Sequence, residues 1–272
     1  MNIAAQTDNV QYTPVTLDMS AASWVDANMC APLGAVLHRA SHNLNPIGFV
    51  KFPPAVQNIL QKNGFLSYYG HAKKPDDYGT TIQYNRFERK DDRYFGAYIE
   101  RHFKNKAIPE MSAALRKKFW ESIFELFSNA VIHSETRMGI FTCGQYFPAK
   151  NRIDFAIADL GIGIPKNLAD KKGLQLPAQD AINWAMEGRN TTKTGPIPGG
   201  LGLKLLREFI RLNQGRIQVV SDAGYWEQRA DGIVDKRTLP HPFPGTVVNI
   251  EINTADVNSY VLSSELQHHN IF

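Results

Sequence analysis

The chain has 272 residues, a formal net charge of +4 at pH 7, and 43% hydrophobic and 21% charged residues. This composition is typical of a globular protein with enough apolar residues for a sizeable core. The small charge, carried by scattered basic residues, argues against a clustered basic face, so nucleic acid is not an expected partner.

Neither the amino terminus nor the rest of the chain predicts a membrane segment. The start, MNIAAQTDNV, lacks a basic stretch followed by an apolar core, and no apolar run approaches the roughly 20 residues of a membrane span. Cys30 and Cys143 are far apart, belong to no metal-binding spacing and have apolar neighbours, which predicts buried, reduced thiols. We therefore expect a cytoplasmic protein without membrane partners.

The first part of the chain predicts a small α/β unit with a partly parallel sheet. Its expected strands are 15–19 and 47–52, and its expected helices are 25–41 and 53–65, the second beginning at prolines and ending at Asn-Gly. The polar, turn-rich stretch 66–79 is the expected linker.

A second unit follows, in which strands and helices again mix. A long amphipathic helix is predicted from Ser112 through His133. The stretch 190–200 has too much Gly, Pro and Thr for regular structure. The remaining expected elements are strands at 80–87, 138–147, 152–160, 216–222, 224–230 and 245–253, and helices at 93–103, 177–188 and 201–213.

Three segments of this unit carry residues suited to chemistry. In ELFSNAVIH, the side chains of Glu125, Asn129 and His133 are spaced by four, which places them on one stripe of the long helix. DLGIGIP (159–165) ends a strand in an aspartate followed by Gly-x-Gly, and GGLGL (199–203) opens a helix after an irregular loop. Exposed surface positions and ordinary turns are the alternative interpretation of each segment taken alone.

The segments fit neither of two common nucleotide-binding fingerprints. There is no Walker loop, and after Gly161 and Gly163 the third glycine of a Rossmann fingerprint is missing while Pro165 stands where its helix would begin. The glycines of GGLGL nevertheless suit a phosphate, because free N–H groups at a helix start face an anion. Asp159, if buried at a strand end, can accept a hydrogen bond from a ligand amine.

In this order and spacing, the three segments resemble the N, G1 and G2 boxes of the GHKL ATPase superfamily, and the resemblance covers about residues 80–253. It implies the Bergerat fold, an α/β sandwich, with ATP and Mg²⁺ as cofactors. By this resemblance Glu125 orients or deprotonates the nucleophile, Asn129 ligates Mg²⁺, and Asp159 binds the adenine amine with Gly161 and Gly163 giving the ring room. The loop 188–200 would be a lid, and the further nucleotide-binding residues implied are Thr192, Gly199, Gly200, Leu201, Gly202 and Thr246.

Within the superfamily, the first box is most similar to that of anti-sigma-factor serine kinases. A histidine-kinase role is disfavoured, because His102 is the only candidate phospho-acceptor and its surroundings fit that pattern poorly. His133 is interpreted as a structural residue at the helix end.

Residues 12–66 resemble a STAS domain, the fold of the anti-sigma antagonists that those kinases phosphorylate. The position of the phosphorylated serine is occupied by Asn28, which cannot be phosphorylated and is instead expected to cap a helix. Ser20 and Ser23 lie nearby, but nothing singles them out. The expected organisation is a STAS-like α/β domain at 1–75, a Bergerat-fold ATPase domain at 76–255 and a carboxy-terminal tail at 256–272.

The sequence thus predicts an Mg-ATP-dependent regulatory ATPase fused to a protein-interaction module. The STAS-like domain would bind a regulatory protein, and a homodimer is an analogy from the superfamily. Two alternatives stay open: a serine/threonine kinase acting in trans, and a nucleotide sensor without catalysis.

Overall fold

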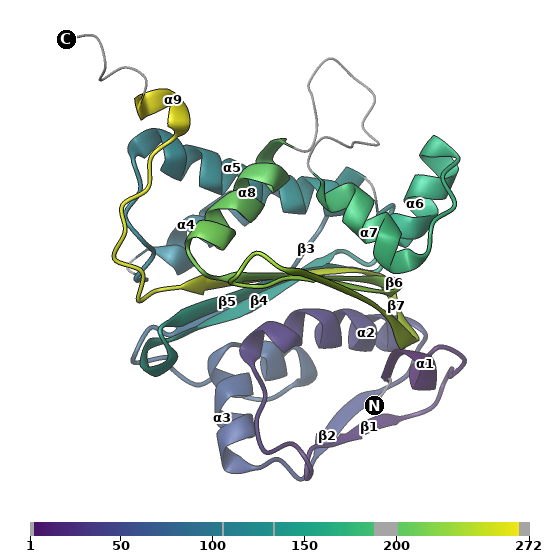
Figure 1. Cartoon of the computed structure of the whole chain (residues 1–272). Helices are drawn as coiled ribbons and strands as arrows, with labels where there is room; N and C mark the ends of the chain where they lie inside the picture. The colour runs from purple at the N-terminus through teal and green to yellow at the C-terminus, as the bar shows by residue number, and fades with distance from the viewer. Residues whose placement is uncertain (1–2, 105, 133, 188–200, 267–272) are drawn as a thin grey trace, which may run out of the picture.

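The computed structural model describes residues 3–104, 106–132, 134–187 and 201–266. These residues form three layers, with helices above a five-stranded sheet and a smaller α/β unit below it (Figure 1). The predicted mixture of helices and strands is confirmed: the five-stranded sheet is antiparallel, and a separate two-stranded sheet is parallel. None of the described helices is both long and apolar enough to cross a membrane.

The amino-terminal unit is built around the parallel pair predicted from the sequence. Strands β1 and β2 pair in register from Val15 opposite Ile47 to Asp18 opposite Val50. The elements of this unit are α1 (Ile3–Thr7), β1 (Val15–Asp18), the 3-10 turn η1 (Ala27–Met29), α2 (Cys30–His42), β2 (Ile47–Val50), α3 (Pro54–Lys62) and η2 (Phe65–Tyr69).

The central sheet has the strand order β3-β4-β5-β7-β6, with every neighbouring pair antiparallel. Its strands are β3 (Thr81–Phe87), β4 (Ile140–Phe147), β5 (Arg152–Asp159), β6 (Arg216–Gln228) and β7 (Val234–Asn253), and the short turn η3 (Pro148–Lys150) joins β4 to β5. Side chains alternate between the two faces of each strand. On β5, Ile153, Phe155 and Ile157 face one core, and Ala156 and Ala158 face the other.

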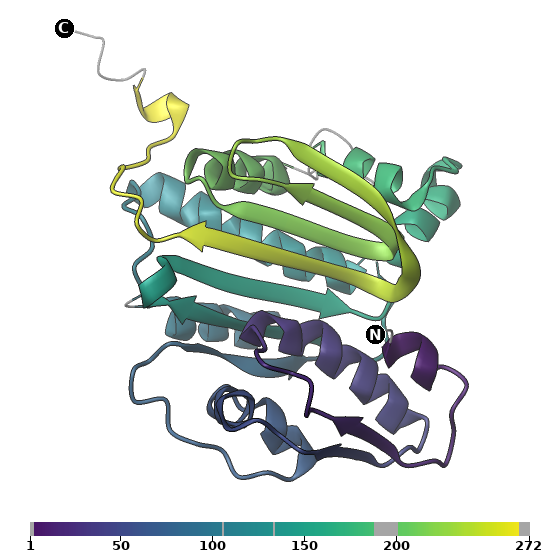
Figure 2. The same ribbon diagram turned by 60° about the horizontal axis from the view of Figure 1, so that its bottom comes forward.

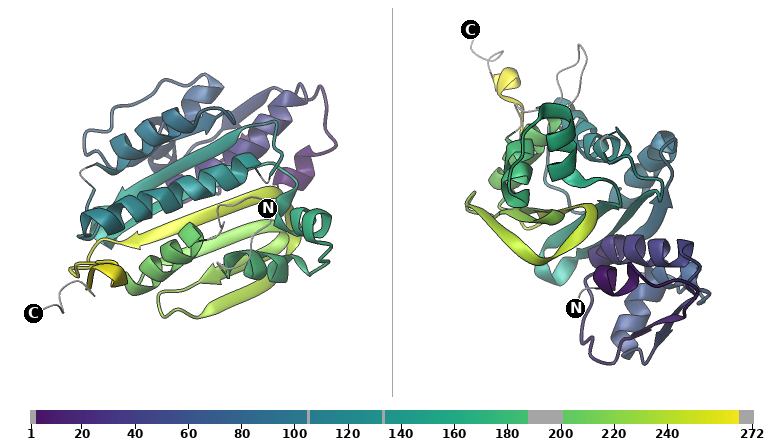
Figure 3. Two further views of the ribbon diagram at one scale, coloured as in Figure 1. Left: turned by 90° about the horizontal axis from the view of Figure 1, so that it is seen from above. Right: turned by 90° about the vertical axis from the view of Figure 1, so that its right-hand side faces the viewer.

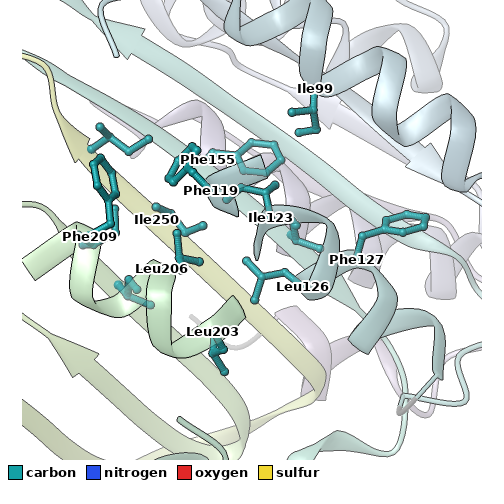
Figure 4. Packing of buried hydrophobic residues seen from close by; sticks show 14 of the residues in the cluster. Ile99, Phe119, Ile123, Leu126, Phe127, Phe155, Leu203, Leu206, Phe209 and Ile250 are labelled. Carbon is teal, nitrogen blue, oxygen red and sulfur yellow. The ribbon is translucent and has the colours of Figure 1, made fainter. Parts of the chain in front are cut away.

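Five helices cover the upper face of this sheet: α4 (Asp92–Phe103), α5 (Ala113–Ile132), α6 (Gly163–Lys172), α7 (Ala178–Met186) and α8 (Leu201–Leu212). Seen from above, α5 runs along the sheet between α4 and α8 (Figure 3). Apolar side chains of α5 and α8 meet over β5 and β7 (Figure 4). The labelled members of this core are Ile99, Phe119, Ile123, Leu126, Phe127, Phe155, Leu203, Leu206, Phe209 and Ile250.

The amino-terminal unit packs directly on the lower face of the sheet, with α2 lying along it (Figure 2). Small side chains on both surfaces, including Ala31 and Ala35 of α2 and Ala156 and Ala158 of β5, belong to one buried cluster. Because these side chains are short, the helix axis can lie close to the sheet. The stretch 70–80 that contains the predicted boundary is irregular, yet the units on its two sides share a core.

Three sequence expectations are wrong in this part of the chain. Pro165 does not prevent a helix, since α6 begins at Gly163 and the proline lies in its first turn, where no backbone donor is needed. The strands expected at 216–222 and 224–230 are one bulged strand, and β7 begins at Val234 instead of 245. Proline-rich residues 240–244 obscured this early start, since proline usually marks the end of a strand.

Asn28 is also not the helix cap expected. It lies within η1, and the residue before α2 is Met29. The buried Asn28 amide instead donates a hydrogen bond to Asn249 Oδ1 of β7 over 2.8 Å. The position is therefore an anchor between the amino-terminal unit and the sheet.

The described part of the carboxy-terminal segment returns to the start of α5. The amide of Ser112 donates to the Tyr260 carbonyl over 2.9 Å, and the Ser112 hydroxyl donates to Glu265 of the short helix α9 (Ser263–Leu266) over 2.7 Å. The Ser112 oxygen also accepts the Leu115 amide at 3.1 Å, which caps α5. The tail expected at 256–272 is thus docked on the start of α5 as far as residue 266.

Candidate functional site

The first end of the candidate site lies where α5 meets the start of α8. Glu125 is half-buried on α5, and its carboxylate accepts a hydrogen bond from the Gly202 amide over 3.0 Å. This amide belongs to the first turn of α8, where backbone N–H groups have no partner within the helix. The sequence segments ELFSNAVIH and GGLGL, about 75 residues apart in the chain, are therefore adjacent in the fold.

Glycine at position 202 leaves room for the Glu125 carboxylate. A Cβ atom at this position would lie 2.3 Å from Glu125 Oε2 and 3.3 Å from the Ser122 Cα. A side chain at this position would therefore displace the Glu125 carboxylate, the end of a flexible side chain, and disturb its hydrogen bond to the Gly202 amide. By the resemblance, the Gly202 N–H is expected to donate to a phosphate. In this structure it donates to the Glu125 carboxylate at the start of α8.

Asn129 follows Glu125 by one turn of α5 and is also half-buried. Within the described part of the chain, its side-chain amide makes no hydrogen bond to protein. Its oxygen is a neutral, hard donor of the kind that Mg²⁺ accepts alongside carboxylates and phosphates. Among the described residues no three His, Cys, Asp or Glu side chains gather into a metal site. Asn129 and Glu125 would therefore hold a cation only together with oxygens from a ligand.

The second end of the site is Asp159, the last residue of β5. It is 4% exposed, and its carboxylate accepts the Gly161 amide over 2.8 Å. Burial raises the pKa of Asp159 to about 7, and hydrogen bonds from Gly161, Ser134 and Thr246 oppose that rise only in part. Near neutral pH this carboxyl can therefore exist in both forms, and a ligand that donates hydrogen bonds to it would favour the ionised one.

The two glycines of DLGIGIP have backbone roles in the fold. A Cβ on Gly161 would lie 1.9 Å from the Ser134 carbonyl oxygen, which accepts the Ile162 amide at 2.7 Å. Gly163 has φ +76°, a left-handed conformation that glycine adopts without strain. The resemblance assigns these glycines to making room for a base, but the space beside Gly161 is taken by Ser134, two residues after the end of α5.

Thr246 lies beside Asp159, because the two residues are direct partners in the β5–β7 pairing. Its hydroxyl contacts the hydroxyl of Ser221 on β6 over 2.9 Å. Sequence inspection missed Ser221 and Ser134. A signal for Ser221 exists: in RIQVVSD it continues the inward-facing alternation of Ile217 and Val219 with a polar residue.

Helix α5 joins the two ends. Ile132, the last residue of α5, follows Glu125 by seven residues, which corresponds to about 10 Å along a helix. Ser134, whose carbonyl holds the loop at Gly161, follows two residues later. Asn129 lies between Glu125 and Ile132. The site is therefore elongated, with a carboxylate and an amide near the α8 end and a buried carboxyl at the β5 end.

Several residues expected at the site cannot be placed. Thr192, Gly199 and Gly200 lie outside the described residues, as does the loop 188–200 expected to be a lid. His133, interpreted from the sequence as a structural residue at the helix end, also lies outside them. Leu201 is the first residue of α8. The structure thus brings together Glu125 with Gly202, and Asp159 with Gly161, Gly163 and Thr246.

No known protein family matches the chain, and no curated protein has significant sequence similarity to it.

Proposed function

We propose that this protein binds Mg-ATP between α5, α8 and the end of β5, and acts as an ATP-dependent regulatory ATPase of the GHKL kind. The observation that carries the proposal is the convergence of three sequence segments on one elongated site along α5. Asp159 lies at one end, and the Glu125–Gly202 contact lies at the other. Asn129 lies between them on the same helix.

The β5 end suits the amino group of adenine. Asp159 is nearly buried, and the other described groups that contact its carboxylate are donors. An amino group adds one more donor to a carboxylate that burial disfavours in its charged form, so binding would stabilise that form. Thr246 provides a second polar oxygen next to it.

The α8 end suits a triphosphate. The start of α8 offers backbone N–H groups and the positive end of the helix dipole. At present Gly202 donates to Glu125, so a phosphate must bind beside this carboxylate or displace it. Repulsion between two anions would be relieved by Mg²⁺, for which Asn129 and the phosphates would supply oxygen ligands. The metal would neutralise charge on the phosphates.

Glu125 is the residue we assign to activation of the nucleophile. Phosphoryl transfer requires positioning and charge stabilisation more than covalent chemistry from the protein. A half-buried carboxylate held by a backbone amide is positioned to accept a hydrogen bond from a water or a substrate hydroxyl. The same geometry serves hydrolysis and transfer to a protein, so a serine/threonine kinase acting in trans remains the second candidate function.

A histidine-kinase role finds no support in the candidate acceptor. His102 lies on α4, and its ring is tilted against the Tyr98 ring with the ring centroids 4.7 Å apart. Burial lowers the pKa of His102 to about 4, with further lowering by Lys106 and Arg101. Its ring is half-buried beside Tyr98, whereas a phospho-accepting histidine must be presented to an incoming phosphate.

We propose a protein-interaction role for the amino-terminal STAS-like unit, with a surface other than that around Asn28. Asn28 is 8% exposed and bonded to Asn249, so this region faces the sheet of the same chain. A regulatory protein would bind the opposite side of the unit. Nucleotide-dependent dimerisation is the third role we consider, in which ATP acts only as a sensed ligand.

One pair of measurements tests these proposals. Mg-ATP should raise the melting temperature of the full chain, since a ligand present at 100 times its Kd adds about 2.7 kcal/mol to the free energy of unfolding. With γ-labelled ATP, free phosphate indicates an ATPase, label on protein indicates a kinase, and binding without either indicates a sensor. A melting temperature that does not respond to Mg-ATP rejects the proposed nucleotide site.

A further inference from the structure

Three polar side chains lie in one row across neighbouring strands of the central sheet. Asp159 of β5 is paired with Thr246 of β7, and Thr246 is paired with Ser221 of β6. Residues two positions earlier on the outer strands, Ile157 and Val219, belong to the core beneath the helices. Because side chains alternate, all three polar groups face the same helix-covered side, where directly paired residues are about 5 Å apart.

Ser221 has no exposed surface, and its oxygen has three neighbours. It accepts the Ile164 amide over 2.8 Å, lies 3.0 Å from the Gly245 carbonyl oxygen and lies 2.9 Å from the Thr246 hydroxyl. A serine hydroxyl has one proton to donate and two lone pairs to accept. The three neighbours therefore use its full hydrogen-bonding capacity.

The positions of the protons follow from what each neighbour can do. The Gly245 carbonyl only accepts, so the Ser221 proton satisfies it, and the Ile164 amide only donates. The remaining lone pair of Ser221 is then filled by the Thr246 proton. In this arrangement all four groups are satisfied, as buried polar groups generally are. Thr246 is left with lone pairs, and no proton, to offer to a ligand beside Asp159.

We propose that Ser221 is a positioning residue that fixes Thr246 as a hydrogen-bond acceptor, so that the site selects a base carrying an amino group over one carrying a carbonyl at the same ring position. The inference rests on the proposed nucleotide site and adds a residue that does not itself contact the ligand. Two adjacent acceptors, Asp159 and Thr246, complement the two hydrogens of an amino group. A carbonyl would face both acceptors without a donor, which is costly when buried.

The test compares the affinity of the full chain for ATP and for inosine triphosphate, which carries a carbonyl where ATP carries the amino group. Isothermal titration calorimetry gives the ratio of the two dissociation constants for the wild type and for Ser221→Ala. Without Ser221 the Thr246 hydroxyl can turn its proton to the ligand. In Ser221→Ala we expect ATP to bind more weakly and inosine triphosphate to bind more tightly than in the wild type. The ratio of the two dissociation constants, and with it the preference for ATP, should fall about fivefold to tenfold.

Further variants separate positioning from general loss of structure. Thr246→Val removes the partly exposed acceptor itself and should also reduce the preference, whereas Thr246→Ser should retain it. Thr142→Val removes a fully buried hydroxyl on β4, outside the row, and should leave the ratio unchanged.

Each outcome is informative. If Ser221→Ala and Thr246→Val weaken both nucleotides by the same factor, the role of these residues is structural and the inference is overturned, while the proposed site stands. If the wild type binds neither nucleotide, the proposed function fails, and the inference fails with it.

Discussion

Substitution of Asp159 by asparagine should change how the stability of the protein depends on pH. The pKa of Asp159 is raised from 3.8 to about 7 in the folded state, so between these pH values the folded chain holds a proton that the unfolded chain has released. Stability therefore falls as pH rises from about 4 to 7 and is level above that. Between pH 5 and pH 8 this single group removes about 2–3 kcal/mol, at roughly 1.4 kcal/mol for each pKa unit.

An asparagine does not titrate in this range. We therefore expect the free energy of unfolding of Asp159→Asn to increase, relative to that of the wild type, by about 2–3 kcal/mol between pH 5 and pH 8. The intrinsic cost of the new side chain is the same at both pH values and cancels from this change. Urea unfolding of both proteins at pH 5, 6, 7 and 8 measures how their difference in free energy of unfolding changes with pH. A difference that does not vary with pH would show that Asp159 is ionised throughout, contrary to the effect of its burial.

A matched control lies on the other face of the same strand. Asp154 is 3% exposed, and burial raises its pKa to about 7 as well, with Arg152 opposing the rise. Asp154→Asn should show a similar pH-dependent gain but keep the rise in melting temperature on addition of Mg-ATP. Asp159→Asn should lose that rise. In the wild type, nucleotide affinity should weaken as pH falls below 7, because the protonated carboxyl of Asp159 accepts poorly. If Asp159→Asn responds to Mg-ATP as the wild type does, Asp159 is not part of a nucleotide site.

Three further substitutions test separate parts of the site and core. Glu125→Ala should abolish phosphate release while leaving Mg-ATP binding largely intact, as measured by turnover and calorimetry; persistent turnover would remove Glu125 from catalysis. Gly161→Ala should cost about 3 kcal/mol or more in urea unfolding, because the new Cβ would lie 1.9 Å from the Ser134 carbonyl oxygen; a cost under 1 kcal/mol would contradict this close packing. Phe127→Ala should cost about 3–5 kcal/mol, since the ring is 1% exposed and stacks 4.3 Å from the Phe95 ring; near-wild-type stability would refute that packing.

Much of the secondary structure could be predicted from local pattern. The long helix expected through 133 is α5, and the expected strands 80–87 and 152–160 are β3 and β5 within one residue at each end. Periodic apolar residues report which face of an element is buried, and caps and turns report where it ends. Local pattern does not predict the helix at 163–172 or the early start of β7, because prolines and glycines usually break an element, whereas here tertiary contacts hold the elements together.

The candidate site was predictable only in part. Glu125, Asn129 and Asp159 were evident because polar residues at these positions conflict with an apolar helix and with a buried strand end. Ser221 is not evident from the sequence, since a single serine in a strand has many explanations until its neighbours are known. Its meaning depends on Thr246 and Gly245 of β7 and on Ile164 of α6, which are distant in sequence.

The sequence alone determined the α/β class, most element positions and the types of residue that suit a nucleotide, because these depend on interactions within a few residues along the chain. Only the tertiary structure decided what those residues contact. It placed the Glu125 carboxylate on the Gly202 amide, closed Gly161 against Ser134 and turned Asn28 toward the sheet. Such contacts depend on the crossing of α5 with α8 and on strand register, which long-range packing sets and local pattern does not encode.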